Sequence, residues 1–308
     1  MINTLALINE AVKNDPAGFI NACEIEYTEN IKALAKRISD NREIKIVAIA
    51  GPSGSGKTTT AHILMRYLEE YGEKTAVLSL DDFYLPISKM PLLGSGERDM
   101  ESVRALDIPR IGRAFKDIIA SGAATVPRFD FLSKSPVENA RRIEVGESGI
   151  IIVEGLHAMN PEITGLVPKA NILKVYISVN LPVENESGEQ ILSSRQVRLA
   201  RRILRDERFR GSAAQQTLCL WNNVVSGEEK HLYCFKNTAD VKLTTLHSFE
   251  PCVYKEPFCA MRNSIDINTP CYEYFIKTAN ALERFCSIKS DLVPDNSLIR
   301  EFIGNKQQ

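Results

Sequence analysis

The stretch IKIVAIAGPSGSGKTT, residues 44–59, decides the fold of this chain. Its first seven residues are mostly apolar and β-branched, a composition typical of a strand that is buried in a sheet. A glycine-rich turn follows at residues 51–56, and residues 58–71 then have the spacing of a helix that ends near Gly72. A buried strand, a glycine-rich turn and a helix in this order predict a loop that binds phosphate groups.

Residues 51–58 match the pattern G-x-x-x-x-G-K-[ST]. Glycines allow backbone N–H groups to converge on phosphate oxygens, and the helix N-terminus adds the positive end of its dipole. We expect Lys57 to reach the terminal phosphates of a nucleotide and the Thr58 hydroxyl to bind Mg²⁺. An ordinary glycine-rich turn is the alternative, and the flanking strand and helix argue against it. The residues expected to bind the nucleotide here are Gly51, Ser53, Gly54, Ser55, Gly56, Lys57, Thr58 and Thr59.

Further strands and helices indicate the fold class. Three more apolar runs are predicted to be buried strands: residues 75–80, 149–153 and 172–178. Residues 108–121 are predicted to form a helix, with Asp107 as its N-cap and Gly122 as its stop. Buried strands that alternate with helices indicate a parallel sheet with helices on both faces. We therefore expect an α/β fold of the P-loop NTPase type, with a lid helix and small appended segments.

Composition excludes several classes of protein. With 25% charged residues and a formal net charge of −1, the chain gives no reason to expect a nucleic-acid or acidic-membrane partner. Seven cysteines without C-x-x-C spacing argue against a disulfide framework or a zinc site, and favour a reducing compartment. No apolar run is long enough for a membrane span and no signal peptide is predicted, so we expect a cytoplasmic protein.

Acidic residues follow two of the predicted strands. In open parallel sheets, ligands bind beyond the carboxyl ends of the strands, where Asp81 and Asp82 are expected. Asp81 could accept a proton from an attacking hydroxyl, or it could merely cap the following turn. Glu154 ends an apolar run of the Walker B type and could hold a metal-bound water. A strand that ends in a solvated glutamate is the alternative for Glu154.

Four arginines have the spacing of one helical face: Arg198, Arg201, Arg202 and Arg205. Apolar residues between them suggest the packed side of that helix: Leu199, Ala200, Ile203 and Leu204. Like charges on one face repel each other unless an anion or carboxylates lie there. A nucleotide polyphosphate under an arginine-bearing lid is one candidate anion, and a solvated charged helix is the alternative. An RNA-binding helix lacks support from net charge or interleaved aromatic residues.

Together these pieces resemble the uridine kinase and phosphoribulokinase family, from about residue 44 to residue 255. The resemblance depends on the order of several short motifs: residues 51–58, 79–84, 127–131, 153–155 and 198–206, followed by Trp221, Gly227-Glu228 and Ala239-Asp240. Residues 296–304, NSLIREFIG, are similar to the tail of a bacterial nucleoside-kinase subgroup of this family.

The resemblance implies ATP-dependent phosphorylation of a nucleoside 5′-hydroxyl, with Mg²⁺ as cofactor and uridine or cytidine as the favoured acceptor. It implies catalytic roles for Asp81, as the base, and for Lys57, Arg202 and Arg205. It places Arg210 at the nucleotide, Thr58 and Glu154 at the metal, and Asp81, Tyr84, Glu101, Phe129, Phe131 and Lys134 at the acceptor. Family members are often oligomeric, so a homo-oligomer is possible.

Departures from uridine kinases cluster on the side that recognises the base. Phe129 stands where those enzymes typically have tyrosine, Lys134 where they have histidine, and Ser212 where they have a further lid arginine. Losing hydrogen-bonding groups from a recognition site changes discrimination strongly, so the acceptor stays open. A kinase of another polyol or of a sugar phosphate is one alternative, since Lys134 or Arg128 could bind the extra phosphate. A regulatory ATPase without an acceptor is the other.

The chain is expected to have three parts. They are an N-terminal helical segment (1–42), a P-loop kinase domain (43–255) with a lid around 195–212, and a C-terminal helical extension packed on that domain (256–308). In the first part, a helix is predicted around residues 5–12, and a second around 31–38 after the break at Asp15-Pro16. Residues 220–255 mix short strand-like runs with turns, and residues 270–288 have the pattern of a helix.

Overall fold

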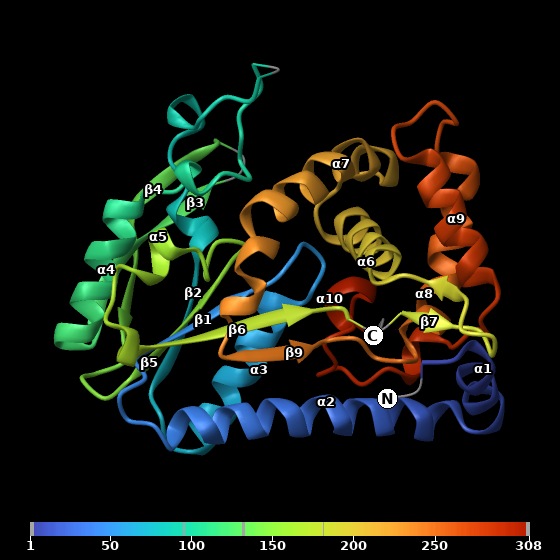
Figure 1. The fold of residues 1–308 in the computed structure, drawn as a ribbon, viewed down its shortest axis with the longest axis horizontal. Helices are drawn as coiled ribbons and strands as arrows, with labels where there is room; N and C mark the ends of the chain where they lie inside the picture. Colours follow the sequence, from blue (N-terminus) through green and yellow to red (C-terminus); the bar gives the residue numbers. More distant parts are fainter. Residues whose placement is uncertain (1–2, 95, 131–132, 181, 306–308) are drawn as a thin grey trace.

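A five-stranded parallel sheet forms the centre of the computed structural model, which describes residues 3–94, 96–130, 133–180 and 182–305. The strand order is β2-β5-β1-β6-β9, with β1 in the middle, between β5 and β6 (Figure 1). The strands are β1 (Ile46–Ala50), β2 (Thr75–Ser79), β5 (Ile150–Glu154), β6 (Ile172–Ser178) and β9 (Val241–Thr244). Because all five run parallel, their carboxyl ends meet at one edge of the sheet, where the glycine-rich loop begins.

The side chains of β1 alternate between two hydrophobic cores. Val47 and Ile49 belong to one core, and Ile46, Ala48 and Ala50 belong to the other. All five residues are buried. A strand that is buried on both faces needs apolar side chains at every position, which explains its unbroken apolar sequence.

Helices cover both faces of this sheet. The core that contains Val47 includes residues of α1 to α3 and of α6 to α10, and the other core includes residues of α4 and α5. In Figure 1, α2 runs below the sheet and α4 lies at its left. The helices are α1 (Leu5–Asn14), α2 (Pro16–Ser39), α3 (Lys57–Glu70), α4 (Ile108–Ser121), α5 (Pro161–Thr164), α6 (Ser194–Phe209), α7 (Ala214–His231), α8 (Glu250–Ala260), α9 (Tyr272–Glu283) and α10 (Arg300–Ile303). Short 3₁₀ helices are η1 (Leu80–Phe83), η2 (Ile87–Lys89), η3 (Val103–Ala105), η4 (Lys169–Asn171), η5 (Tyr233–Thr238), η6 (Met261–Ser264) and η7 (Ser290–Leu292).

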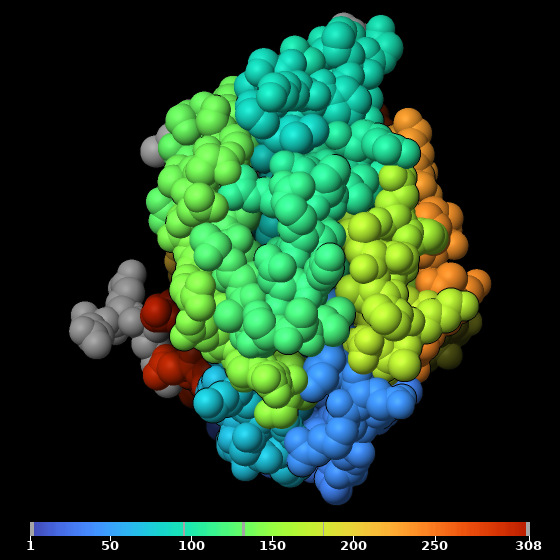
Figure 2. Space-filling model, turned by 90° about the vertical axis from the view of Figure 1, so that its left-hand side faces the viewer, coloured from blue at the N-terminus to red at the C-terminus, as the bar shows by residue number. Residues whose placement is uncertain are grey.

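Two antiparallel hairpins lie outside the central sheet. They are β3 (Ala123–Asp130) with β4 (Ser135–Glu144), and β7 (Val183–Glu184) with β8 (Gln190–Leu192). The register of the first hairpin shifts between Val126 and Arg128, around Pro127, which has no N–H group to donate to the ladder. Figure 2 shows this hairpin and α4 covering one face of the molecule, with the cyan segment that precedes α4 projecting above them.

The predicted α/β fold, a parallel sheet with helices on both faces, is confirmed. Each predicted strand is present within one or two residues of its expected bounds. Helix α4 has the predicted ends, because Asp107 accepts a hydrogen bond from the N–H of Arg110 at 3.0 Å and Gly122 is left-handed, with φ of 69°.

Some sequence-based predictions of local structure were wrong. The segment 220–255 contains one short strand, β9, as predicted, but it is otherwise mainly helical, because α7, η5 and α8 occupy most of it. The β-branched pair Val224-Val225 and the nearby Gly227 hide the helical pattern of α7, and Trp221 and Val224 are buried on one of its faces. The second N-terminal helix is also longer than predicted. It begins at Pro16, directly after the cap at Asp15, and not near residue 31.

The division into parts 1–42, 43–255 and 256–308 stays a prediction, and one hydrophobic core contains residues from all three. The predicted cytoplasmic location, homo-oligomer and lack of a nucleic-acid partner also stay predictions. Among the residues that the structure describes, no helix is both long and apolar enough to cross a membrane. All seven cysteines belong to the described residues, and each is free.

Candidate active site

The phosphate loop turns sharply between β1 and α3. Gly54 and Gly56 have φ of 73° and 78°, a backbone conformation that residues with a Cβ rarely adopt. A Cβ on Gly54 would also lie only 3.0 Å from the carbonyl oxygen of Arg198. Lys57 Nζ donates to the carbonyl oxygen of Pro52 at 3.2 Å, so its ammonium group lies back over the loop. The loop therefore has the shape that the motif predicts.

Arg198 of α6 holds the first part of this loop. Its Nε donates to the carbonyl oxygen of Ser53 at 2.9 Å, and its Nη1 lies 3.0 Å from the hydroxyl of Tyr233. The guanidinium group is buried and forms an ion pair with the buried carboxylate of Glu228. Charge-assisted hydrogen bonds fix geometry well, so Arg198 holds the loop in place. Its guanidinium group is already paired within the protein.

Arg201 braces the next peptide of the loop in the same way. Its Nη1 donates to the carbonyl oxygen of Gly54 at 3.1 Å, and it forms hydrogen bonds of 2.7 and 2.6 Å with the carboxylate of Glu250. Neither Arg201 nor Glu250 is exposed to solvent. Arg198 and Arg201 therefore face buried carboxylates, one of the two kinds of partner expected for the four arginines, and the alternative of a solvated charged helix is wrong for these two residues.

The other arginines gather around one carboxylate beside the loop. Arg205 donates to Asp206 Oδ1 at 2.8 Å, and Arg202 and Arg210 lie 3.4 and 3.6 Å from the same carboxylate. Arg202 Nη1 also donates to the hydroxyl of Ser53 at 2.6 Å. Three guanidinium groups thus lie around one buried carboxylate, and Arg205 also lies 3.8 Å from Glu301. The roles of these arginines in catalysis and phosphate binding stay predictions.

Two carboxyl groups lie near Lys57, at the ends of β2 and β5. Desolvation by the surrounding site raises the pKa of Asp81, in η1, and the charge of Lys57 is the strongest influence that opposes this rise. Glu154 is paired with Ser79 across the strands and hydrogen-bonded to it. Burial, followed by the nearby Asp81 carboxylate, raises the pKa of Glu154 to about 7. Burial lowers the pKa of Lys57, and these two carboxylates oppose the change. The structure thus brings the three predicted residues together.

Three predicted acceptor residues lie beside this charged group. The rings of Tyr84 and Phe129 are in edge contact, with 5.5 Å between centroids. The Tyr84 hydroxyl donates to the carbonyl oxygen of Met100 at 3.1 Å. Burial raises the pKa of the adjacent Glu101 to about 7, and the charge of Arg202 opposes this rise most strongly. An aromatic wall and a carboxyl group suit a ring that carries hydroxyls.

Other predicted residues are placed differently. Lys134 is exposed in the turn of the β3–β4 hairpin, where its φ is 54° and its carbonyl oxygen accepts from the N–H of Ile87 at 3.2 Å. Phe131 lies outside the described residues. Thr58 is exposed at the start of α3.

Two acidic residues at the site were not among those predicted. Glu228 of α7 accepts a 2.7 Å hydrogen bond from the N–H of Ser53, inside the phosphate loop. Glu301 of α10 accepts a 2.5 Å hydrogen bond from the hydroxyl of Thr59, and it lies 3.8 Å from Arg205. Glu228 and Glu301 both belong to short motifs on which the family resemblance depends. A motif of this kind does not show which residues its members contact, so these contacts could not be predicted.

A magnesium ion bound with a nucleotide needs few protein ligands. Within the described ranges, no group of three or more His, Cys, Asp or Glu side chains could hold a metal ion. Mg²⁺ commonly takes one or two protein oxygens, with phosphates and water as its other ligands. The hydroxyl of Thr58 and the carboxylate of Glu154 fit that requirement and stay the predicted ligands.

Most of the site described above lies within a part of the chain that matches a known protein family. The family model described as "Phosphoribulokinase / Uridine kinase family" matches residues 46–248, which include the phosphate loop, both carboxyl groups and the arginines of α6. The chain belongs to this family. Such membership supports a P-loop kinase, and ATP with Mg²⁺ is what the family implies.

Several relatives of this family member are uridine kinases. The uridine kinase of Staphylococcus epidermidis is 27% identical over 197 residues, which are 64% of this chain and 85% of that protein. The uridine kinase of Mycoplasma genitalium is 28% identical over 59% of this chain and 75% of that protein. Uridine-cytidine kinase C of Dictyostelium discoideum is 31% identical over 122 residues, 40% of this chain, but the match spans only 25% of that protein.

A solved structure agrees with the fold of this family member. A possible uridine kinase from Bacillus stearothermophilus superposes with a TM-score of 0.50 and 20% identity, covering 71% of this chain and 99% of that chain. At this identity the likeness supports the P-loop kinase fold and nothing finer.

We expect the free energy of unfolding to fall as pH rises through the range in which Glu154 titrates. Its pKa rises from 4.5 to about 7 on folding, so the folded chain holds this proton where the unfolded chain has lost it. The free energy of unfolding, measured in urea, should therefore fall between about pH 4.5 and pH 7 by about 1–3 kcal/mol less in a Glu154→Gln variant than in the wild type.

Glu69→Gln, at an exposed position of α3, is the control for Glu154→Gln and should follow the wild type. Comparison of variants is needed because burial lowers the pKa of His157 to about 4, which gives the opposite pH dependence. Parallel curves for Glu154→Gln and wild type would contradict the raised pKa.

Proposed function

We propose that this kinase transfers the γ-phosphoryl group of ATP to the 5′-hydroxyl of a nucleoside, with uridine and cytidine as the first candidates. One observation carries the proposal: Asp81 follows β2 in η1, and among the charges around it that of Lys57, in the phosphate loop, does most to lower its pKa. A carboxylate close to the phosphate-binding lysine can serve as the base in a phosphoryl transfer. The uridine kinases among its relatives support a nucleoside as the acceptor.

The residues of the loop fit a nucleotide polyphosphate. The left-handed Gly54 and Gly56 let backbone N–H groups approach an anion, and Lys57 lies beside them. Mg²⁺, held by Thr58 and Glu154, would neutralise charge on the β- and γ-phosphates. The guanidinium groups of Arg202, Arg205 and Arg210 around Asp206 suit the same anion.

The proposed reaction is an in-line displacement at phosphorus. Asp81 accepts the proton of the acceptor hydroxyl as its oxygen bonds to the γ-phosphorus, while the bond to the β,γ-bridging oxygen breaks and ADP leaves. The proton then passes from Asp81 to water. Lys57, Arg202 and Arg205 stabilise the negative charge that develops on the transferred group.

The acceptor side supports a ribose more directly than it supports a particular base. A carboxylate such as that of Glu101 accepts hydrogen bonds from vicinal hydroxyls, and Tyr84 and Phe129 supply an aromatic wall. Phe129 has no hydroxyl for a base edge, and the exposed Lys134 could bind a phosphate group. Sugar phosphates therefore belong among the acceptors to be tested.

The test is ADP release from MgATP with a panel of ribonucleosides, deoxynucleosides and sugar phosphates. We expect uridine or cytidine to raise the rate by about tenfold or more over basal hydrolysis. The matched control is 5′-deoxyuridine, which keeps the base and the vicinal hydroxyls but lacks the attacking oxygen, and it should give no increase. Stimulation only by a sugar phosphate would reassign the acceptor. Basal hydrolysis that no compound stimulates would favour a regulatory ATPase.

A further inference from the structure

The last part of the chain lies against the phosphate loop, although more than 200 residues separate the two in sequence. A Cβ on Gly56 would lie 2.8 Å from a methyl carbon of Leu298, which is fully buried. The segment 294–305 is held by the buried Arg300, whose guanidinium group donates to the carbonyl oxygens of Gly304 at 2.8 Å and Ser290 at 3.0 Å. Ser297 is hydrogen-bonded to Glu24 of α2. This C-terminal segment is therefore held firmly against the phosphate loop.

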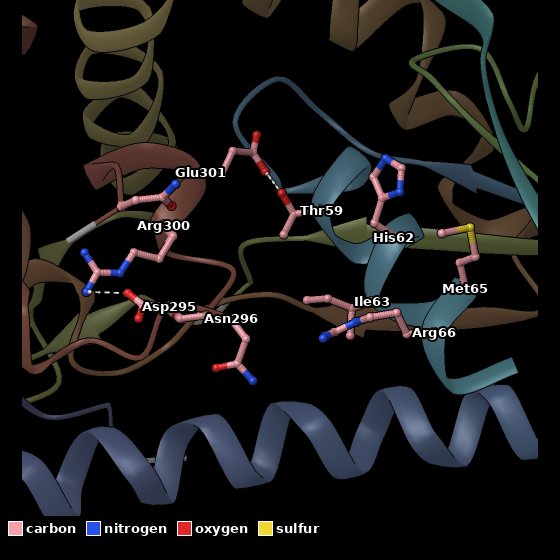
Figure 3. Close-up of a pocket in the computed structure, with 11 residues that line it drawn as sticks. Thr59, His62, Ile63, Met65, Arg66, Asp295, Asn296, Arg300 and Glu301 are labelled. Carbon is pink, nitrogen blue, oxygen red and sulfur yellow. Dashed lines mark hydrogen bonds and ion pairs between the residues drawn. The ribbon is translucent and has the colours of Figure 1, made fainter. Parts of the chain in front are cut away.

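A cavity of about 490 Å³ lies between the C-terminal segment and α3. Side chains on one face of α3 form one side of it: Thr59, His62, Ile63 and Arg66. Asn296 and Glu301 are among those on the other side. Figure 3 shows these side chains extending from the two segments, with the hydrogen bond between Thr59 and Glu301 at one end. The volume falls in the range of about 300–1,000 Å³ that is typical of ligand sites.

The cavity begins where a bound triphosphate would leave the loop. The lysine of such loops binds the β- and γ-phosphates, and here Asp81 lies near that lysine. The far end of the triphosphate must then point away from Asp81. Thr59 lies two residues beyond Lys57 on α3 and is the first residue of this helix to line the cavity.

We propose that this cavity binds the nucleoside end of the phosphate donor, with the C-terminal segment as its outer wall. The inference rests on the proposed function in one respect, that the donor is a nucleoside triphosphate. The segment lies outside residues 46–248, the part that matches the family model, so this wall is a feature of the chain beyond the matched region.

The chemistry of the cavity suits a ribonucleoside. Ile63 and Met65 offer apolar surface, and the planar side chains of His62 and Arg66 can stack on a base. Glu301 already accepts from Thr59 and lies 3.8 Å from Arg205, and its carboxylate has lone pairs left for further hydroxyl donors. The ribose 2′- and 3′-hydroxyls are such donors. Glu301 is thus a specificity-determining residue for the sugar of the donor.

The test is direct binding, without any acceptor, of MgATP and of magnesium tripolyphosphate, measured by calorimetry. Filling the cavity with His62→Trp or, from the opposite wall, Asn296→Trp should weaken MgATP binding by about tenfold or more. Tripolyphosphate, which has no nucleoside, should bind each variant within about twofold of the wild type. Both positions are exposed, so the variants should fold.

Matched controls place the same bulk outside the cavity. Glu69→Trp lies further along α3, Asp291→Trp lies in η7, and both positions are exposed. Both controls should bind the two ligands like the wild type. For Glu301→Gln, the loss should be several-fold larger for ATP than for 2′,3′-dideoxy-ATP, which lacks the ribose hydroxyls.

The outcomes separate this inference from the proposed function. Unchanged MgATP binding in both cavity-filling variants would overturn the inference, as would an equal loss for MgATP and tripolyphosphate. A chain that binds MgATP as expected but phosphorylates no nucleoside would retain the inference and lose the proposed function. Failure of the wild type to bind either ligand would contradict both the inference and the proposed function.

Discussion

Replacing Asp81 by asparagine is expected to lower kcat by about 10²–10⁴-fold, with a much smaller change in the KM for the acceptor. The amide has the shape of the carboxylate but cannot accept the proton of the attacking hydroxyl. The measurement is steady-state ADP release with the acceptor that the panel identifies, together with MgATP binding, which should be retained.

Asp82→Asn is the control for this prediction. Asp82 is the next residue of η1, but the strongest opposing charge at its carboxylate is Arg141 of β4 and not Lys57. We expect its kcat to stay within about threefold of the wild type. An Asp81→Asn variant that keeps its rate, or an Asp82→Asn variant that loses as much, would exclude Asp81 as the base.

Replacing Arg201 by methionine is expected to destabilise the fold by about 3–5 kcal/mol. The substitution leaves the carboxylate of Glu250 buried without the two hydrogen bonds of 2.7 and 2.6 Å that Arg201 donates to it, and neither residue is exposed to solvent. It also removes the hydrogen bonds to the carbonyl oxygens of Gly54 and Thr245. The free energy of unfolding, measured in urea, should show this loss.

A second variant and a control make the Arg201 prediction specific. Arg201→Met combined with Glu250→Leu removes both charges, so we expect it to recover much of the loss. Arg195→Met, at another position of α6, breaks an ion pair with Glu229 of α7. Both of these side chains are about half exposed, so the change should cost no more than about 1 kcal/mol. Equal losses for Arg201→Met and Arg195→Met would contradict the importance of burial.

The fold could be predicted because its signals are local and agree with one another. Strands buried on both faces, such as β1, are unbroken apolar runs, and the glycines that follow permit one kind of turn. The sequence signals for the ends of α4 were also local, since Asp107 caps the helix and Gly122 stops it. In α7 the β-branched pair Val224-Val225 contradicted the helical pattern, and burial of one face against the core decided the outcome.

The candidate site could be predicted only where the motif itself fixes position. Lys57, Asp81 and Glu154 follow strands of one parallel sheet, so the topology alone brings them to one edge. The partners of the α6 arginines could not be predicted, since Glu228 is 30 residues from Arg198 and Glu250 is 49 residues from Arg201. A helical spacing gives the face of a residue but not what packs against that face.

The braces on the phosphate loop have a consequence for how it meets its ligand. Arg198 and Arg201 hold the carbonyl oxygens of Ser53 and Gly54. Because a trans peptide unit is planar, the N–H of Gly54 must then point away from α6. The anion-binding surface is therefore formed by folding, and the loop loses little conformational entropy when a phosphate arrives. Nucleotide affinity and fold stability thus depend on the same two guanidinium groups, and neither can be adjusted there without changing the other.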